Sequence, residues 1–470
     1  MKKQFEGDWF IPSYPNNKLP GILTIDEGVI ELTLYSLTDF RGQSFIENEN
    51  EIHRYTIILG ETWGDKITLL NSDLLGTNKI GTKLCTFSVA PKTVFEGNHF
   101  NSPDEITITS LTCSYSFLTA WMDDLTYDSP LKNQVDTFHD FDSRLYKRTT
   151  VEIEDGFNIH IEQFLREHDV TERNSLSFKI HHSVVFVAKS ERGFIEFERK
   201  AIEFQKLMEL GLDCPINAHL AMMNKGETSQ KPIFIHRART YKTISTDSDS
   251  YRNHGAMLFS YDKLGENDFK EIMKKWFASF KTYSVVYNIY LDTHQWFKGT
   301  GVFLTSVMFN NRVLNIIQGL EHYHRLANEK DDESEEEFKS NLQTILSKLT
   351  DSSDHEWLKK RTSPLRKVLR KRLFELLKKY GYMFGELFAN SERKMTFVHE
   401  LSEIRNSLSH GLNTNPDIGI QSYEIYEQSR ILLLACILDT LGMTKEKTQE
   451  LIVQSHEYGP MLRFYRKQRA

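Results

Sequence analysis

The stretch that decides the fold of the C-terminal half reads Met395-Thr-Phe-Val-His-Glu-Leu-Ser-Glu-Ile-Arg-Asn-Ser-Leu-Ser-His-Gly411. Its apolar residues recur at the 3.6-residue period of an α-helix, and this spacing predicts a helix that buries one face. The residues of that face are Phe397, Leu401, Ile404 and Leu408. Gly411 suits the end of such a helix, because glycine adopts the left-handed backbone of a C-terminal cap without a steric penalty.

The polar residues of the same stretch gather on the other side of the predicted helix. At about 100° per residue, one stripe forms along that side. It consists of His399, Glu403, Asn406 and His410. Arg405 lies on the flank, beside the apolar face. We expect His410 at the helix end, where its imidazole can reach a ligand.

Helical spacing continues over most of the chain after Asp268 and predicts an all-helical domain over residues 281–470. Ser363 and Pro364 are typical of a helix start and Gly381 of a helix stop, so we expect one helix from Ser363 to Tyr380. The acidic run at residues 329–337 repels itself and is predicted to be a solvated loop.

The preceding residues 1–280 are rich in short β patterns separated by Gly, Asn, Asp and Pro. Expected strands lie at Gly28–Tyr35, Tyr55–Leu59, Glu105–Thr109, Phe157–Glu162, Leu176–Ile180, Val184–Ala188 and Ile233–Ile235, with one helix at Phe194–Leu212. This pattern is typical of a sandwich or barrel. The fold class is therefore α+β, and residues 1–148 and 149–280 are two candidate subdomains of the β-rich half.

The composition indicates a globular protein of several domains. Its 470 residues exceed what one hydrophobic core usually serves. A hydrophobic content of 39% with 26% charged residues excludes a wholly disordered chain. The net charge of −7 excludes a histone-like basic coat, so any contact with nucleic acid must be local. Cys85, Cys113, Cys214 and Cys436 form no close pair, which indicates free thiols rather than disulfides or a zinc site.

The chain is expected to be cytoplasmic. Residues 1–12 lack the unbroken apolar run of a signal peptide. The longest aliphatic run near the end, Ile431–Leu438, is far shorter than the roughly 20 residues that span a bilayer. We therefore expect no membrane helix.

The run Glu403-Ile-Arg405-Asn406-Ser-Leu-Ser-His410-Gly411 resembles the signature of HEPN domains, an arginine followed by a polar residue and, a few residues later, a histidine. Arg393 and His399 also satisfy this spacing, but Arg393 is followed by a lysine rather than the Asn, Asp or His usual in the family. At the other end, Gly7-Asp-Trp9, Leu19-Pro-Gly21 and the strands after them resemble the N-terminal region of ApeA-like HEPN proteins of bacterial phage defence.

The residue types fit the chemistry of metal-free RNA cleavage. Such cleavage needs a group that takes or gives a proton and a positive charge that stabilises the phosphorane. The ordinary pKa of histidine lies near neutral pH, so His410 can serve as acid or base. The planar guanidinium of Arg405 matches two phosphate oxygens. Asn406 is expected to orient the imidazole or the substrate.

The resemblance implies a metal-independent endoribonuclease without a cofactor. It also implies a homodimer in which the motif helices of two protomers face each other, and products with a 2′,3′-cyclic phosphate and a 5′-hydroxyl. Family members often place an acid of the preceding long helix against the motif, and Glu321 occupies that place here. The alternative for Glu321 is a plain ion pair with Arg325 at i, i+4.

A set of basic residues lies on or just before the helix expected from Ser363. The candidates for RNA contact are Lys360, Arg366, Lys367, Arg370 and Lys371. Such a face can bind the RNA backbone through counterion release. An ordinary solvated helix face remains the alternative.

The leading hypothesis is a toxic ribonuclease of abortive infection. Its β-rich half would sense a trigger, for which a phage component is one candidate, and its HEPN half would cut RNA, for which tRNA is one candidate. The alternative is a non-catalytic dimerising protein whose β-rich half recognises a ligand or partner. Catalysis predicts Arg405 and His410 exposed in one cleft beside basic residues, whereas a binding protein predicts them separated or buried in ion pairs.

Overall fold

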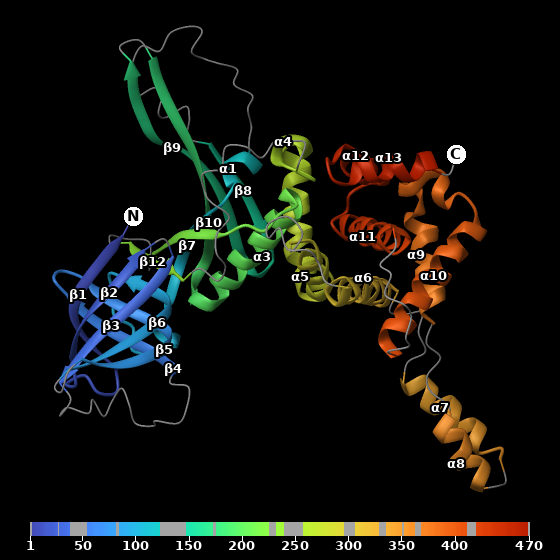
Figure 1. Cartoon of the computed structure of the whole chain (residues 1–470), viewed down its shortest axis with the longest axis horizontal. Helices are drawn as coiled ribbons and strands as arrows, with labels where there is room; N and C mark the ends of the chain where they lie inside the picture. The colour runs from blue at the N-terminus through green and yellow to red at the C-terminus, as the bar shows by residue number, and fades with distance from the viewer. Residues whose placement is uncertain are drawn as a thin grey trace. The chain divides into compact units, whose positions relative to one another are not determined.

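The computed structural model describes residues 2–26, 28–37, 54–80, 84–122, 147–172, 175–224, 232–238, 257–295, 306–328, 335–349, 352–361, 368–410 and 420–468. The chain folds into two compact units (Figure 1). The first consists of Met1–Asn253 with Phe259–Lys274, and the second of His254–Leu258 with Lys275–Ala470.

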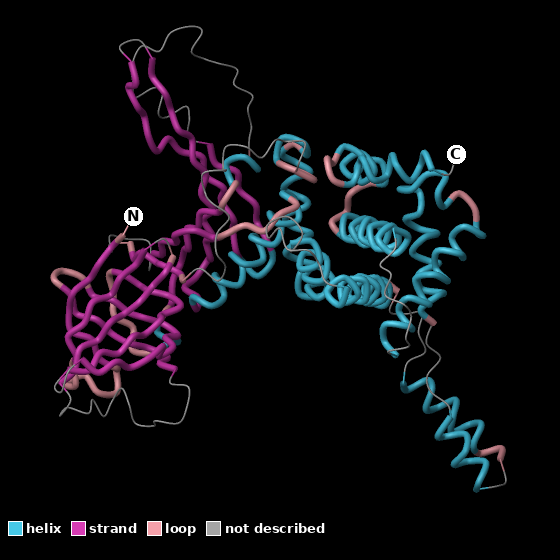
Figure 2. Tube along the Cα trace, viewed as in Figure 1, coloured by secondary structure: helices cyan, strands magenta, loops and turns pink. Residues whose placement is uncertain are grey.

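The first unit is built on one 12-stranded sheet, drawn in magenta in Figure 2. Its strands are β1 (Lys3–Phe10), β2 (Leu19–Asp26), β3 (Val29–Leu37), β4 (Arg54–Thr62), β5 (Lys66–Ile80), β6 (Leu84–Glu96), β7 (Thr107–Tyr115), β8 (Lys147–Ile153), β9 (Phe157–Glu172), β10 (Ser175–Gly193), β11 (Ala218–Asn224) and β12 (Ile233–Arg237). The strand order is β3-β2-β1-β4-β5-β6-β12-β11-β7-β10-β9-β8, with an additional β3–β6 pairing.

The first six strands close into a barrel, because β6 pairs with β3 as well as with β5. Alternation fills its interior: in β2 the buried residues are Leu19, Gly21, Leu23 and Ile25. Trp9 is fully buried and packs so closely on Gly60 that a Cβ there would lie 2.3 Å from Trp9 Cζ3. Glycine is therefore required at this position for the indole to fit.

The remaining strands extend the sheet beyond the barrel, and helix α3 (Phe194–Leu212) packs on β7 and β10. Phe157 meets Phe197 of α3 edge to face at 5.0 Å, and Phe204 contacts Phe186 in the same manner at 6.1 Å. The short elements of this unit are η1 (Pro103–Glu105), α1 (Leu118–Trp121), η3 (Glu154–Gly156) and α4 (Tyr261–Leu264). The predicted β-rich half is thus confirmed, and its architecture is a barrel with extra strands.

Two details of the predicted strands are wrong. Residues 103–105 form a 3₁₀ turn led by Pro103, so the strand expected from Glu105 begins at Thr107. The strands expected at Leu176–Ile180 and Val184–Ala188 are one strand, β10, because its pairing with β9 continues through the intervening residues.

The second unit is all helical, which confirms the predicted class of the C-terminal half. Its helices are α5 (Glu266–Gln295, from Lys275 onward), α6 (Ser306–Ala327), α7 (Glu335–Leu346), α8 (Ser352–Arg361), α9 (Leu369–Tyr380), η7 (Gly381–Phe388), α10 (Ser391–His410), α11 (Ile420–Thr440), α12 (Lys445–Gln454) and α13 (Tyr458–Gln468). Helix α11 is the centre of the core, because residues 431–438 are all buried and α11 packs on α6, α9 and α12. Domain limits at residue 280 stay a prediction, since α5 contributes residues to both units.

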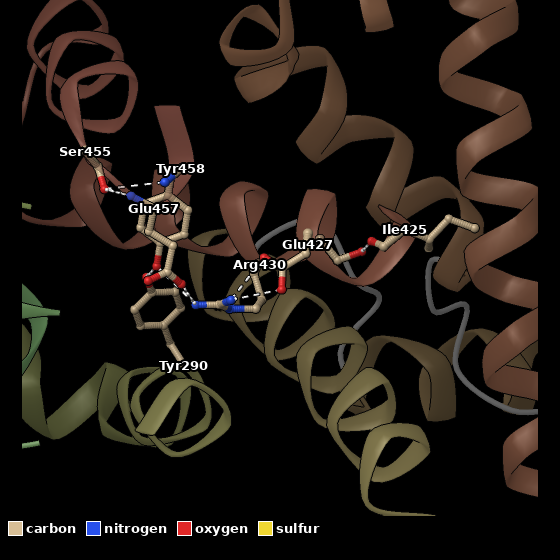
Figure 3. Close-up of polar contacts among 8 residues, drawn as sticks. Tyr290, Ile425, Glu427, Arg430, Ser455, Glu457 and Tyr458 are labelled. Carbon is tan, nitrogen blue, oxygen red and sulfur yellow. Dashed lines mark hydrogen bonds and ion pairs between the residues drawn. The ribbon is translucent and has the colours of Figure 1, made fainter. Parts of the chain in front are cut away.

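A buried polar network holds α11 in place (Figure 3). Arg430 donates to both carboxylate oxygens of Glu427, at 3.1 and 3.0 Å, and to Glu457 at 3.3 Å. It also donates to the hydroxyl of Tyr458, which lies 2.5 Å from the hydroxyl of Tyr290. Helices α5, α11 and α13 are therefore joined by polar contacts inside the core.

The helix expected from Ser363 begins later. Helix α9 starts at Leu369, and Val368 before it has an extended backbone. Lys359 and Arg361 belong to a separate helix, α8. Residues 362–367, with Ser363 and Pro364, lie outside the described residues. At its other end α9 stops at Tyr380 with Gly381 as its C-cap, as predicted; the backbone of Gly381 is right-handed, and the 3₁₀ segment η7 follows.

The acidic run is also corrected in part. Residues 335–337 form the first turn of α7 instead of a loop, and acidic side chains are favoured at the positive end of a helix dipole. Residues 329–334 lie outside the described ranges. No helix in the described ranges is both long enough and apolar enough to span a membrane.

Candidate active site

Helix α10 carries the predicted motif and packs on α6, α9 and η7. Its buried face is formed by Phe397, Val398, Leu401 and Ser402. Ile404 and Leu408, also predicted for this face, are half-buried. Ser402 is accommodated because its hydroxyl donates to the backbone oxygen of Val398 at 2.7 Å. The predicted amphipathic helix thus exists, and its apolar contacts are concentrated in its middle.

Arg405 lies one turn beyond the buried part of this helix. It follows Leu401 by four residues and Ser402 by three, so it continues their side of α10. Its side chain is half-buried, and Nη1 donates to Oδ1 of Asn406 at 3.4 Å. Within the described ranges Arg405 has no acidic partner. The guanidinium is therefore partly removed from water and carries a charge that no carboxylate there compensates.

His410 is the last helical residue of α10, as the sequence predicts. Its side chain and Gly411 lie outside the described residues. The backbone alone separates the two motif positions, because five residues along an α-helix correspond to a rotation of about 140°. Arg405 and His410 thus start from different sides of the same helix.

The exposed stripe of α10 forms an ion pair with α9. His399 and Glu403 are exposed and Asn406 is half-buried. Nη2 of Arg370, in the first turn of α9, donates to Oε1 of Glu403 at 2.6 Å. A residue predicted to bind RNA and the helix of the predicted catalytic motif are therefore in direct contact.

The other candidates for RNA contact are placed differently. Lys371 is exposed on α9. Its neighbour Arg372 is buried and does not belong to a solvated basic face. Lys360 belongs to the last turn of α8, but its side chain is not described, and Arg366 and Lys367 lie outside the described ranges.

Glu321 forms the ion pair that the sequence offers as its alternative. Its Oε1 accepts from Nη2 of Arg325 at 2.5 Å, one turn further along α6. The same helix carries His324, which is buried and lies 2.6 Å through Nε2 from Oε2 of Glu375 in α9. The sequence gives no signal for this second contact, because its partners are 51 residues apart.

A chain of hydroxyl contacts fixes α9 against α6 and α11. The hydroxyl of Tyr323 lies 2.8 Å from that of Tyr380, which donates to Oδ2 of Asp439 at 2.8 Å. Lys379 donates to the same carboxylate oxygen at 2.9 Å. Burial raises the pKa of Tyr323 and that of Tyr380, so both hydroxyls stay protonated at neutral pH. These groups therefore position α9, which carries Arg370.

Comparison with protein families gives two matches. The model described as ApeA N-terminal domain 1 matches residues 4–276, which is more than half of the chain. The chain belongs to this family. The model described as Apea-like HEPN matches residues 314–447. The helical unit of this ApeA-family protein therefore contains a HEPN domain, and HEPN domains form a family of ribonucleases. The resemblance seen in the sequence is confirmed.

The matched HEPN segment contains all of α9, α10 and α11, and so contains Arg370, Arg405 and Arg430. Tyr290 and Tyr458 lie on either side of it. The buried network of Arg430 thus joins the HEPN domain of this ApeA-family chain to flanking helices. A search of curated proteins and a search of solved structures found no match.

Proposed function

We propose that the HEPN domain is a metal-independent endoribonuclease in which Arg405, Asn406 and His410 are the catalytic residues. The observation that carries this proposal is the environment of Arg405. Arg405 is half-buried, so part of its hydration is lost, and no carboxylate among the described residues supplies a counter-charge. A phosphate group of RNA supplies that counter-charge, with oxygens that match the guanidinium.

Each residue has a defined role in this proposal. Arg405 binds the scissile phosphate and stabilises its transition-state charge. Asn406, whose Oδ1 accepts from Arg405, orients the guanidinium. His410 takes the proton of the 2′-hydroxyl, whose oxygen bonds to the phosphorus as the P–O5′ bond breaks, or gives a proton to the departing 5′-oxygen; the products are a 2′,3′-cyclic phosphate and a 5′-hydroxyl. Glu321 contributes a carboxylate only when its ion pair with Arg325 opens.

Within one protomer the two motif positions start from different sides of α10, as the non-catalytic alternative predicts, so the proposed catalysis requires a homodimer. One α10 helix directs residues 405 and 410 from sides about 140° apart, so two copies facing each other can combine Arg405 of one with His410 of the other. RNA, with tRNA as one candidate, is the proposed substrate. We further propose that the protein acts in abortive infection and that a phage-derived trigger acts through the β-rich half.

The test compares the parent protein with two histidine variants of α10. Purified parent, His410→Ala and His399→Ala proteins are incubated with total cellular RNA in EDTA. Each reaction is run with and without an extract of phage-infected bacteria. Fragment size and 3′-end chemistry are then measured. His399 is the matched control, because it is exposed on the same helix.

We expect fragments with cyclic phosphate ends from the parent and His399→Ala proteins, in at least one condition. The His410→Ala protein should give no fragments beyond those that the extract alone produces. Equal cleavage by the parent and His410→Ala proteins would remove His410 from the mechanism. Failure of all three proteins to cleave RNA in both conditions would overturn the proposed activity.

A further inference from the structure

The ion pair between Arg370 and Glu403 joins the two helices that the proposed function uses. The residues are 33 positions apart in sequence, and their charged atoms lie 2.6 Å apart. Both side chains are open to water, with exposed fractions of 45% for Arg370 and 56% for Glu403. A pair this exposed is weak, because water and salt screen its charges.

Local charge explains why the two side chains meet. The first turn of α9 contains Arg370 and Lys371 and no acidic residue, although acidic residues are preferred there. Glu403 of α10 supplies the missing negative charge. It also lies on the same side of α10 as the position of His410, because seven residues along an α-helix correspond to a rotation of about 340°, so an RNA backbone that approaches this side of α10 meets the carboxylate.

We propose that Arg370 and Glu403 form an exchangeable ion pair through which Glu403 limits the affinity for RNA. In the free protein the carboxylate occupies Arg370. When RNA binds, a phosphate replaces the carboxylate on the guanidinium, and Glu403 returns to water. This inference rests on the proposed function, since it assigns a regulating residue to the same site.

Exposure makes the exchange possible at this pair. A phosphate binds a guanidinium through two parallel hydrogen bonds, whereas only one hydrogen bond joins Nη2 of Arg370 to Oε1 of Glu403. The pair of Arg430 and Glu427 differs, because its side chains are only 3% and 2% exposed and RNA cannot reach them. The geometry thus separates an exchangeable pair on the surface from a permanent pair in the core.

The test measures binding without cleavage. A 2′-O-methyl oligoribonucleotide lacks the 2′-hydroxyl nucleophile and reports affinity alone. Its Kd is measured for the full-length parent, Glu403→Gln, Arg370→Gln and the double variant over a series of salt concentrations. Glu271→Gln is the matched control: Glu271 pairs with Lys274 at 2.7 Å, and their exposed fractions of 57% and 47% are similar.

We expect Glu403→Gln to bind the oligonucleotide about two- to fivefold more tightly at low salt, the range that an exposed ion pair allows. Arg370→Gln should weaken binding only slightly in the parent, because Glu403 already compensates Arg370. In the Glu403→Gln background, Arg370→Gln should weaken binding more. The dependence of Kd on salt concentration should also fall by the amount expected for the loss of about one phosphate contact. Glu271→Gln should leave Kd unchanged.

Three results would overturn the exchange. These are an unchanged or weaker affinity of Glu403→Gln, an equal cost of Arg370→Gln in both backgrounds, and absence of oligonucleotide binding by every protein. RNA cleavage that depends on His410 would survive the first two, and the proposed function with it. Conversely, tighter binding by Glu403→Gln with no RNA cleavage by the parent would refute the nuclease and leave the exchange in place.

Discussion

Replacing Arg430 should lower the free energy of unfolding of the helical unit by several kcal/mol, because it removes the cation of a buried ion pair. Burial opposes the charge of Arg430, but Tyr458, Glu427 and Tyr426 outweigh it and hold its pKa well above its usual range. In Arg430→Met, the carboxylate of Glu427 keeps an exposed fraction of about 2% and loses its two hydrogen bonds from Arg430. Removing one partner of a buried ion pair costs about 3 to 5 kcal/mol.

A second variant separates the stranded charge from the lost packing. In Glu427→Met with Arg430→Met the buried carboxylate is removed as well. Replacing both members of a buried pair by apolar residues of similar volume is nearly neutral. We therefore expect the double variant to recover most of the stability that Arg430→Met loses.

Amide hydrogen exchange followed by mass spectrometry measures this effect region by region. A cost of about 3 to 5 kcal/mol corresponds to exchange roughly a hundred- to five-thousandfold faster in peptides of α11. Peptides of the barrel should not change. Lys447→Met, which breaks the exposed pair of Lys447 with Glu450, is the control and should accelerate exchange only a fewfold. Equal exchange in the single and double variants would refute the stranded charge as the cause.

Two further predictions concern the β-rich unit. Gly60→Ala should destabilise the barrel by about 1 to 3 kcal/mol, because the new Cβ would overlap the Trp9 ring. Gly76→Ala is the control and should not destabilise it, because no atom lies within 4 Å of the Cβ position there. Thermal unfolding of the two variants distinguishes a packing clash from a general effect of replacing glycine. Burial lowers the pKa of His182 to about 4, so between pH about 4 and 6.5 the unfolded chain binds a proton that the folded chain does not. The contribution of His182 to the free energy of unfolding, up to roughly 3 kcal/mol, is therefore present above pH about 6.5 and lost as the pH falls toward 4. Stability curves of the parent and His182→Gln that keep the same slope between these pH values would contradict this assignment.

The sequence predicts elements whose signal is local. Helix α3 begins and ends where its pattern predicts, and α10 ends at His410 as expected. Both signals lie within a few residues of the element that they describe. The closing of the barrel could not be predicted in this way, because the pairing of β3 with β6 joins residues about fifty positions apart and leaves no mark in either strand alone.

The same distinction applies to the candidate site. The motif residues of α10 follow from spacing and from family resemblance. The contact of Arg370 with Glu403 and that of His324 with Glu375 depend on how α6, α9 and α10 pack. The start of α9 was predicted too early, because Ser363 and Pro364 offer a start signal, whereas the extended backbone of Val368 separates them from the helix.

The pairing of strand β6 limits the conformational changes that the N-terminal unit can undergo. Its residues 84–89 pair with β3 and its residues 93–96 with β12, while Pro91, which has no N–H to donate, stands between these two ladders. A slip of one residue would turn Val89 and Val94 out of the core. If this unit senses a trigger as proposed, β6 cannot change its register gradually. It either moves as a rigid body or breaks the hydrogen bonds of one whole ladder together, and the second response is all or none.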